Sequence, residues 1–226
     1  MDKVILAYSG GLDTSVAIKW LNETYNLEVI CVTVDVGNER DFASIQEKAL
    51  RTGAVKAYVH DAKDDFVKYF VWPSLQAGTI YEGQYPLATA LARPLIAKIM
   101  VDYAQREGAS LVAHGCTGKG NDQVRFDVSF NALQPDLKIV APVREWRWTR
   151  EEEILFAQKH GIPVPVTVGS PYSVDQNLWG RSVEAGVLED PSVEPPEDVY
   201  AWTTSARHTP MEPSYVDIEF DRGIPV

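Results

Sequence analysis

The chain has 226 residues and a formal net charge of −11, from 32 acidic against 21 basic residues. This acidic balance argues against a general nucleic-acid-binding surface and against attraction to anionic membranes, so we expect neither partner. Apolar residues make up 45% and charged residues 23%, which excludes a largely disordered chain. Two cysteines, Cys31 and Cys116, exclude a disulfide framework and predict a cytoplasmic protein.

The N-terminal part alternates apolar runs with helical patterns. The expected elements are a strand at 4–8, a helix at 13–25, a strand at 28–35, a helix at 41–53 and a strand at 55–59. The first apolar run is too short for a signal peptide or a membrane-spanning helix. This order, with nearly continuous apolar strands, predicts a doubly wound parallel α/β sheet with helices on both faces.

The same alternation continues to about residue 160. The expected elements are a helix at 87–107, strands at 110–114 and 138–141, and helices at 121–133 and 149–160. Pro94 should kink the first of these helices near Ala90, because proline lacks an N–H group. Asn121 can cap the second helix, and Thr149 with Glu152 forms a capping-box pattern for the third.

Prolines become frequent after Gly161. We therefore expect a nucleotide-binding domain at 1–167 and part of a second α+β domain at 168–226. Residues 215–220 alternate like a half-buried strand, and an apolar end follows shortly after. This ending is typical of an interruption inside a hairpin, so we expect the tail to be the beginning of the second domain.

A glycine-rich loop at residues 9–15 joins the first strand to the first helix. Gly10 and Gly11 let backbone N–H groups turn inward, and a helix N-terminus adds positive potential, which together favour a phosphate. Asp13 could hold Mg²⁺ against that phosphate. The alternative is a tight strand-to-helix turn with an ordinary cap. The loop lacks the lysine of a Walker loop and the third glycine of a dinucleotide fingerprint.

A second glycine-rich loop, within residues 114–126, follows the fourth strand and opens a helix. Lys119 supplies a mobile cation, and Asn121 and Arg125 share one face of the helix. Both loops lie at the same edge of the sheet if the first and fourth strands are neighbours. The alternative is a flexible glycine turn with a solvated lysine.

Two motifs carry a resemblance to known proteins. Residues 7–15, Ala-Tyr-Ser-Gly-Gly-Leu-Asp-Thr-Ser, resemble the pyrophosphate loop of ATP pyrophosphatases that release AMP. Residues 115–126, Gly-Cys-Thr-Gly-Lys-Gly-Asn-Asp-Gln-Val-Arg-Phe, are similar to the argininosuccinate synthase family in particular. Further matches at 85–94 and 173–186 extend the resemblance over essentially the whole chain. It implies an adenine nucleotide α-hydrolase-like fold.

The resemblance implies a ligase of arginine biosynthesis that condenses citrulline with aspartate while ATP is cleaved to AMP and pyrophosphate. The ureido oxygen of citrulline attacks the α-phosphate to give citrullyl-AMP, and the aspartate amine then displaces AMP. ATP, Mg²⁺ and the two amino acids are the implied ligands. The implied assembly is a homo-oligomer, a tetramer in the full-length family.

The resemblance also assigns roles to individual residues. The ATP-binding residues are Ala7, Tyr8, Ser9, Gly10, Gly11, Leu12, Asp13, Thr14, Ser15, Val34 and Gly115. The citrulline-binding residues are Tyr85, Thr89, Arg93, Asn121, Arg125, Ser173 and Ser182. Aspartate is assigned to Thr117, Asn121 and Asp122. The catalytic residues are Asp13, Lys119 and Asp122, with Asp13 also as the Mg²⁺ ligand.

The chain departs from the family at two points. Ala90 stands where many members have serine, and family chains are nearly twice as long. We therefore expect this chain to bind ATP and to turn over poorly or not at all. A nucleotide-binding module without turnover remains an alternative. An ATP-dependent tRNA-modifying enzyme is a second alternative, although the acidic charge and the absence of paired cysteines argue against it.

Several other groups are interpreted as structural. The four histidines lack ligand spacing, so a metal site made of them is not expected. Residues 146–148 should anchor the following helix, and residues 151–153 supply first-turn negative charge that the helix dipole favours. Cys116 is incidental to the chemistry.

Overall fold

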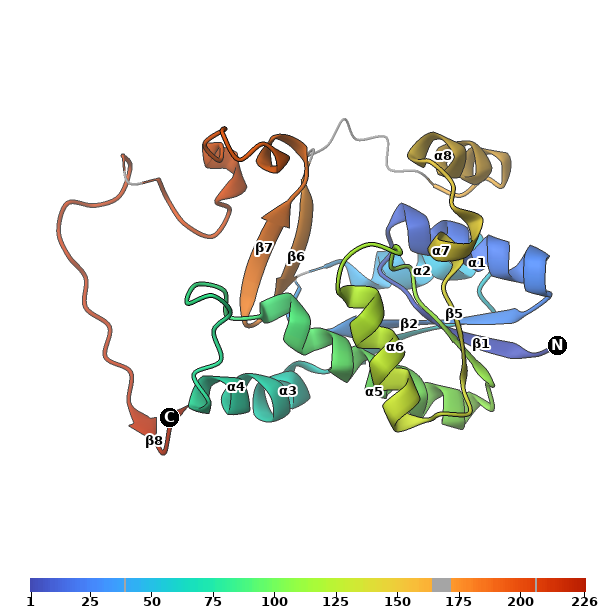
Figure 1. The fold of residues 1–226 in the computed structure, drawn as a ribbon, viewed down its shortest axis with the longest axis horizontal. Helices are drawn as coiled ribbons and strands as arrows, with labels where there is room; N and C mark the ends of the chain where they lie inside the picture. The colour runs from blue at the N-terminus through green and yellow to red at the C-terminus, as the bar shows by residue number, and fades with distance from the viewer. Residues whose placement is uncertain (39, 164–171, 206) are drawn as a thin grey trace.

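The computed structural model describes residues 1–38, 40–163, 172–205 and 207–226. A parallel five-stranded sheet lies at its centre, in the spatial order β3-β2-β1-β4-β5 (Figure 1). The strands are β1 (Lys3–Ala7), β2 (Glu28–Asp35), β3 (Lys56–Asp61), β4 (Leu111–Ala113) and β5 (Lys138–Val140). Each lies within two residues of its predicted position, and the parallel pairing confirms the predicted α/β class.

Helices lie on both sides of the sheet (Figure 1). One side carries α1 (Leu12–Tyr25), α2 (Phe42–Thr52), α7 (Pro142–Trp146) and α8 (Arg150–Lys159). The other carries α3 (Lys63–Phe66), the π-helical turn η1 (Val67–Val71), α4 (Trp72–Gln76), α5 (Ala88–Glu107) and α6 (Asp122–Leu133). The run from α3 to α4 has no counterpart among the predicted elements.

The side chains of β1 divide the core into two layers. Ile5 packs into a cluster with residues of α3, α5 and α6, whereas Val4 and Leu6 pack with residues of α1 and α2. All three are completely buried. Since alternate residues of a strand face opposite sides, an apolar run without interruption is what a sheet covered on both faces requires.

The strand order reverses at the centre of the sheet, because β1 pairs with β2 on one side and with β4 on the other. The β1–α1 loop and the β4–α6 loop therefore lie next to each other at the carboxyl edge, where ligands bind in folds of this type. The two loops are in close contact. A Cβ atom at Gly115 would lie only 2.8 Å from Cγ2 of Thr14. This contact confirms that both glycine-rich loops share one edge.

A hairpin of β6 (Ser173–Asn177) and β7 (Gly180–Glu184) stands over this edge (Figure 1). The Asn177 side chain donates to the Ala88 carbonyl at 2.8 Å, and the Trp179 indole donates to the Pro86 carbonyl at 2.8 Å. These bonds fix the hairpin against the start of α5. The predicted domain boundary at 167/168 lies outside the described residues, and the hairpin was not among the predicted strands.

The C-terminal part is mostly extended (Figure 1). Two short 3₁₀ turns, η2 (Gly186–Glu189) and η3 (Glu197–Val199), precede a small hairpin of β8 (Phe220–Asp221) and β9 (Ile224–Pro225). The expected half-buried strand at 215–220 is wrong. Tyr215, Val216 and Ile218 are exposed, since no sheet in the described part of the chain covers them.

Several helix ends follow the predictions. Thr149 and Glu152 form the predicted capping box of α8, and Gly53 ends α2 in a left-handed conformation. Asn121 occupies the position before α6, but its side chain makes no capping hydrogen bond, so the prediction of an asparagine cap is wrong. Pro94 lies inside α5, and the helix continues past it to Glu107.

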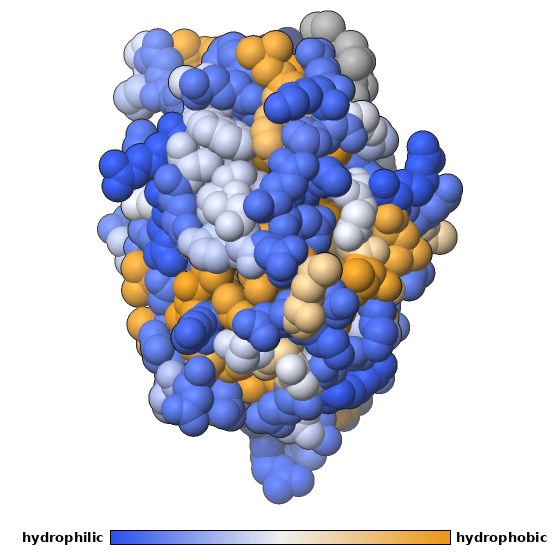
Figure 2. All heavy atoms as spheres, turned by 90° about the vertical axis from the view of Figure 1, so that its right-hand side faces the viewer, coloured by the Kyte–Doolittle hydropathy of each residue, from blue (hydrophilic) through white to orange (hydrophobic). Residues whose placement is uncertain are grey.

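The opposite, amino edge of the sheet has a different character. Figure 2 shows hydrophilic side chains over most of that face, with hydrophobic side chains in patches between them. None of the helices in the described ranges is long and apolar enough to cross a membrane.

The contact between the two loops can be tested by filling the space at Gly115. Gly115→Ala should lower the free energy of unfolding by about 1–3 kcal/mol, because an added methyl group overpacks against Thr14. Gly118→Ala is the matched control, since its Cβ would lie 3.8 Å from the nearest atom, Cγ of Arg144.

Thr14→Ser in the Gly115→Ala background should restore most of the lost stability, because it removes Cγ2 and keeps the hydroxyl. Urea denaturation followed by circular dichroism measures all four proteins. Equal stability of Gly115→Ala and Gly118→Ala would contradict the close contact.

Candidate functional site

A cavity of about 890 Å³ lies at the carboxyl edge of the sheet. It is bounded by the two glycine-rich loops, the start of α5 and the β6–β7 hairpin. From the predicted ATP-binding set, it is lined by Ala7, Tyr8, Ser9, Gly11, Asp13, Thr14, Val34 and Gly115. From the other predicted sets, it is lined by Tyr85, Thr89, Arg93, Thr117, Lys119, Asn121, Asp122, Arg125, Ser173 and Ser182. The structure thus brings nearly all predicted site residues together. The exceptions are Gly10, Leu12 and Ser15.

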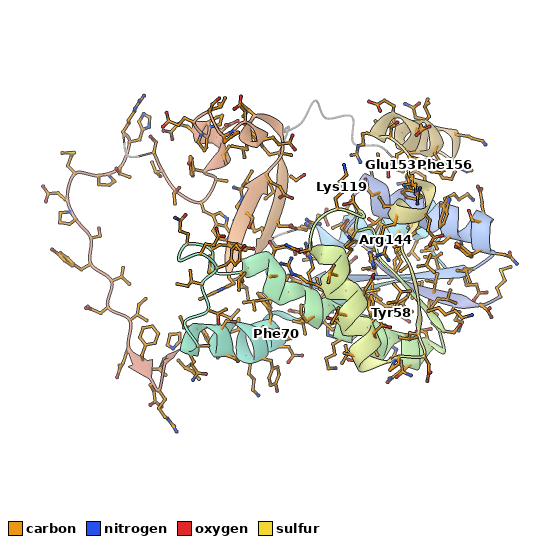
Figure 3. The ribbon with its side chains drawn as sticks, viewed as in Figure 1. Tyr58, Phe70, Lys119, Arg144, Glu153 and Phe156 are labelled. Carbon is orange, nitrogen blue, oxygen red and sulfur yellow. The ribbon has the colours of Figure 1, made fainter. Side chains whose placement is uncertain are left out.

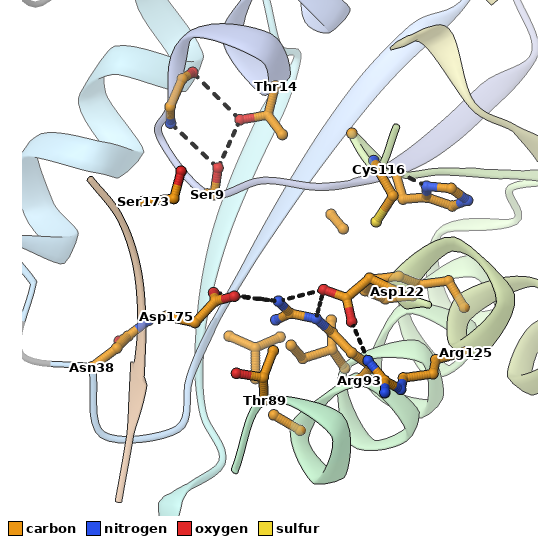
Figure 4. A pocket seen from close by; sticks show the side chains of 18 of the residues that line it. Ser9, Thr14, Asn38, Thr89, Arg93, Cys116, Asp122, Arg125, Ser173 and Asp175 are labelled. Atoms are coloured by element: carbon orange, nitrogen blue, oxygen red, sulfur yellow. Dashed lines mark hydrogen bonds and ion pairs between the residues drawn. The ribbon is translucent and has the colours of Figure 1, made fainter. Parts of the chain in front are cut away.

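The first loop presents hydroxyl and N–H groups to the cavity. The hydroxyls of Ser9 and Thr14 are 3.1 Å apart, and Ser9 Oγ accepts from the Gly11 N–H at 3.3 Å (Figure 4). Gly10 has a φ of 78°, which a residue with a side chain rarely adopts. Gly11 precedes α1 and provides no side-chain cap, so the first N–H groups of the helix face outward. This arrangement suits an anion.

Ser15 differs from the other hydroxyl residues of the loop. Its side chain is completely buried, donates to the Gly11 carbonyl at 2.7 Å and lies 3.0 Å from the Tyr8 hydroxyl. Burial raises the pKa of Tyr8 to about 12, so this pair stays neutral. Ser15 therefore fixes the turn from inside instead of lining the cavity.

Two cations that the sequence did not single out hold the carbonyls of the same loop. Arg40 donates to the Ser9 carbonyl at 2.9 Å, and Lys48 donates to the Gly10 carbonyl at 2.9 Å. Partial burial lowers the pKa of Lys48. These bonds tie the first loop to Arg40, just before α2, and to Lys48 within α2. No spacing pattern in the sequence links either residue to the loop.

Arg93 is surrounded by carboxylates. Its Nε donates to Asp122 at 2.8 Å, and its Nη2 lies 3.3 Å from Asp175, which sequence reasoning missed (Figure 4). Arg125 donates to the other oxygen of Asp122 at 2.7 Å. The resemblance assigned Arg93 to citrulline binding. In the structure the chain's own carboxylates occupy it, and it joins α5, α6 and β6.

The two guanidinium groups determine the charge of Asp122. Burial alone would raise its pKa, but Arg93 and Arg125 outweigh burial and hold the pKa below its usual value. Asp122 is therefore a stable carboxylate that can bind an ammonium group. With its lowered pKa, Asp122 is poorly suited to accept a proton. A catalytic role of Asp122 would therefore be to supply negative charge and to position a ligand.

His114, interpreted from the sequence as a scattered histidine, organises the second loop. Its ring is completely buried, its Nδ1 accepts from the Cys116 N–H at 3.2 Å, and its Nε2 lies 3.0 Å from Asp127. Because Nδ1 accepts, Nε2 carries the proton and donates to Asp127. Arg144 pairs with the second oxygen of Asp127 at 2.8 Å (Figure 3). Burial lowers the pKa of His114, which keeps it neutral.

The rest of the second loop is more open. Lys119 is exposed and extends from the loop, while the Thr117 hydroxyl donates to the Lys119 carbonyl at 3.1 Å (Figure 3). Cys116 lines the cavity, and burial raises the pKa of its thiol to about 11, which makes it unreactive at neutral pH. This agrees with its interpretation as incidental.

Asp13 belongs to a charged cluster at the start of α1. Its Oδ1 accepts from Arg150 at 2.6 Å, and the same nitrogen of Arg150 lies 3.2 Å from Glu153. Glu153 lies in the first turn of α8, as predicted, and its side chain is buried there, which the sequence did not indicate (Figure 3). Burial, followed by the nearby Asp13 carboxylate, raises the pKa of Glu153 to about 7.

The chain is similar to known proteins over nearly its whole length. Two families match the chain: "Arginosuccinate synthase N-terminal HUP domain" at residues 3–163 and "Arginosuccinate synthase C-terminal domain" at 172–226. Curated proteins named argininosuccinate synthase are 61% identical in Dehalococcoides mccartyi strain BAV1 and 60% identical in Oceanobacillus iheyensis. The alignments cover 100% of this chain and 55% and 54% of those proteins. The chain thus spans about half the length of the curated relatives it matches.

A solved structure supports the fold assignment. The crystal structure of a predicted subunit of tRNA methyltransferase from Methanocaldococcus jannaschii aligns with a TM-score of 0.50 and 15% identity. The alignment covers 70% of this chain and 76% of that one. At this identity the similarity concerns the fold alone.

The buried state of His114 predicts a pH dependence of stability. Because its pKa is lowered in the folded chain, the unfolded chain binds the proton more readily below about pH 6.5. The contribution of His114 to the free energy of unfolding is therefore fully present above that pH. It decreases as the pH falls, by up to about 1.4 kcal/mol per pH unit.

His114→Gln removes this component, so its free energy of unfolding should change less steeply between pH 7.5 and 5.5 than that of the unmodified chain. Urea denaturation at several pH values measures both slopes. The remaining titratable groups are the same in both proteins and serve as the internal control. Parallel slopes would show that His114 does not contribute.

Proposed function

The chain belongs to the argininosuccinate synthase family, and we propose that it carries the ATP, citrulline and aspartate sites of an AMP-forming ligase that makes argininosuccinate. The observation that carries this proposal is that the larger cavity is lined by both glycine-rich loops and by the β6–β7 hairpin. A cavity of about 890 Å³ has the size of a small-molecule site.

ATP binding is proposed at the first loop. The N-terminus of α1, the Ser9 and Thr14 hydroxyls and the backbone around Gly11 would hold the phosphates. Val34 at the end of β2 would lie beside the adenine, and Gly115 would let the nucleotide approach the second loop closely. These residues come from neighbouring strands, so the site is fixed by the sheet.

The residues at Asp13 fit a magnesium ion that arrives with ATP. In the described part of the chain, no cluster of three or more His, Cys, Asp or Glu side chains could hold a metal alone. Mg²⁺ commonly binds through one or two carboxylates together with substrate phosphates, and Asp13 is a carboxylate on the phosphate loop. When bound there, the ion would neutralise phosphate charge.

The amino-acid substrates are proposed at the other end of the cavity. Asp122 is a stable carboxylate for the aspartate ammonium group, with Thr117 and Asn121 beside it. Tyr85, Thr89, Asn121, Arg125, Ser173 and Ser182 would bind citrulline. Arg93 would act through Asp122 and Asp175, because its guanidinium already pairs with both.

The proposed reaction needs position and charge more than a covalent nucleophile. The ureido oxygen of citrulline attacks the α-phosphate, giving citrullyl-AMP and pyrophosphate; the aspartate amine then attacks the activated carbon and AMP leaves. The first loop would bind the departing pyrophosphate, and Lys119 would offset negative charge near the second loop. Asp122 would orient the amine.

The proposal is tested by pyrophosphate–ATP exchange. The chain should bind MgATP in a calorimetric titration and should exchange labelled pyrophosphate into ATP when citrulline is added, without aspartate. Arg125→Gln should retain MgATP binding and lose the citrulline-dependent exchange, because Arg125 lies at the amino-acid end of the cavity. MgATP binding without any citrulline-dependent exchange would favour the nucleotide-binding module instead.

Asp13→Asn tests the proposed magnesium contact. The variant should lose about 1.5–3 kcal/mol of MgATP binding free energy, as expected for a charged contact, but should bind metal-free ATP at least as well as the unmodified chain. Asp102→Asn is the matched control, because Asp102 is exposed on α5 and pairs with Lys98. Calorimetry with and without Mg²⁺ measures the effect, and unchanged MgATP affinity in Asp13→Asn would rule the contact out.

A further inference from the structure

A second cavity, of about 410 Å³, lies directly beyond the N-terminus of α1. It is lined by residues of the first loop, by Gly115 and Ser173, and by Arg150 of α8. Among the described residues that line it, Arg150 is the one cation. No motif in the sequence points to Arg150, and none of the proposed contacts with ATP, citrulline or aspartate uses it.

Arg150 reaches the loop from a well-supported position. It is the first residue of α8, directly after the Thr149 capping box. The ring centroids of Trp148, two residues before Arg150, and of Phe156 on α8 lie 4.9 Å apart. The side chain itself is 60% exposed, so it can move while its backbone stays fixed.

The present partners of Arg150 are two carboxylates. Asp13 at 2.6 Å and Glu153 at 3.2 Å both bind a single nitrogen, Nη1. An arginine has five N–H donors in a planar fork, so most of the fork is not needed for these two bonds. The side chain of Glu153 is 7% exposed, which makes it a fixed support, whereas Asp13 is 39% exposed and lies on the loop.

The charges around Arg150 change when a phosphate enters this cavity. A phosphate beside the Asp13 carboxylate is repelled unless a cation lies between them. A magnesium ion bound to Asp13 would also repel the guanidinium that now pairs with Asp13. Glu153 would still hold the base of the side chain, and the planar fork matches the oxygens of a phosphate group.

We infer that Arg150 binds the pyrophosphate end of ATP and that Glu153 is a positioning residue that keeps Arg150 beside the first loop. The inference rests on the proposed binding of ATP at this loop. It adds a residue from α8 to a site otherwise made from the sheet edge. A contact of this kind discriminates ATP and pyrophosphate from AMP.

Calorimetric titrations with MgATP, magnesium pyrophosphate and AMP test the inference. Arg150→Gln should weaken binding of MgATP and of pyrophosphate roughly ten- to hundred-fold, as for a lost charged contact, and should leave AMP binding unchanged. Arg150→Lys should be intermediate, because it keeps the charge and loses the fork. Lys159→Gln is the matched control, since it removes one positive charge from the exposed last turn of α8.

Loss of Arg150 also leaves the buried Glu153 without its partner, which could disturb the fold. The double variant Arg150→Gln/Glu153→Gln has no unpaired carboxylate at position 153. Compared with Glu153→Gln alone, it should lose affinity for MgATP and pyrophosphate and keep its affinity for AMP. Unchanged affinity for MgATP and pyrophosphate, or an equal loss for AMP, would overturn the inference. An unmodified chain that binds none of the three ligands would instead contradict the proposed function.

Discussion

The close approach of the β1–α1 and β4–α6 loops is the constraint on which the site depends. β1 and β4 are neighbours, and Gly115 lies so close to Thr14 that a side chain would not fit between the loops. One loop offers N–H and hydroxyl groups, and the other offers the carboxylate and guanidinium groups of α6. A single cavity can therefore hold a phosphate and an amino acid side by side. Neither loop alone has the groups for both.

Arginine side chains gather at the site although the chain is acidic overall. The chain carries a net charge of −11, yet Arg93 and Arg125 line the larger cavity and Arg150 lines the smaller one, each paired with a carboxylate of the chain. Such pairs hold each guanidinium near its cavity before a ligand binds. They also leave donor positions open, because each guanidinium has five N–H groups. Overall charge therefore says little about what this cavity binds.

The sequence predicted what depends on local pattern and missed what depends on distant partners. Continuous apolar runs located all five strands of the parallel sheet. The glycine-rich loops located the cavity, because in a parallel sheet with β1 beside β4 both loops lie at the carboxyl edge. The partners of Arg93 could not be predicted, because Asp122 and Asp175 lie 29 and 82 residues away. The burial of Glu153 depends on how α8 packs on α1, and a first-turn acidic run gives no sign of it. The alternation at 215–220 predicted a strand because period alone does not say whether a neighbouring sheet exists.

The chemistry that the cavity can support depends on which of its side chains can accept or donate a proton at neutral pH. Asp122 is held ionised by two guanidinium groups, and both ring nitrogens of His114 are occupied by Cys116 and Asp127. Burial raises the pKa of the Tyr8 hydroxyl to about 12 and of the Cys116 thiol to about 11, so both stay protonated at neutral pH. Among the described residues, Glu153 has a pKa raised to about 7, and it lies at the phosphate end beside Arg150, away from Asp122. The proposed reaction would therefore be accelerated by alignment and charge neutralisation. Phosphate activation of a neutral ureido group is suited to that kind of site, because its barrier lies in the charge on the phosphates more than in proton transfer.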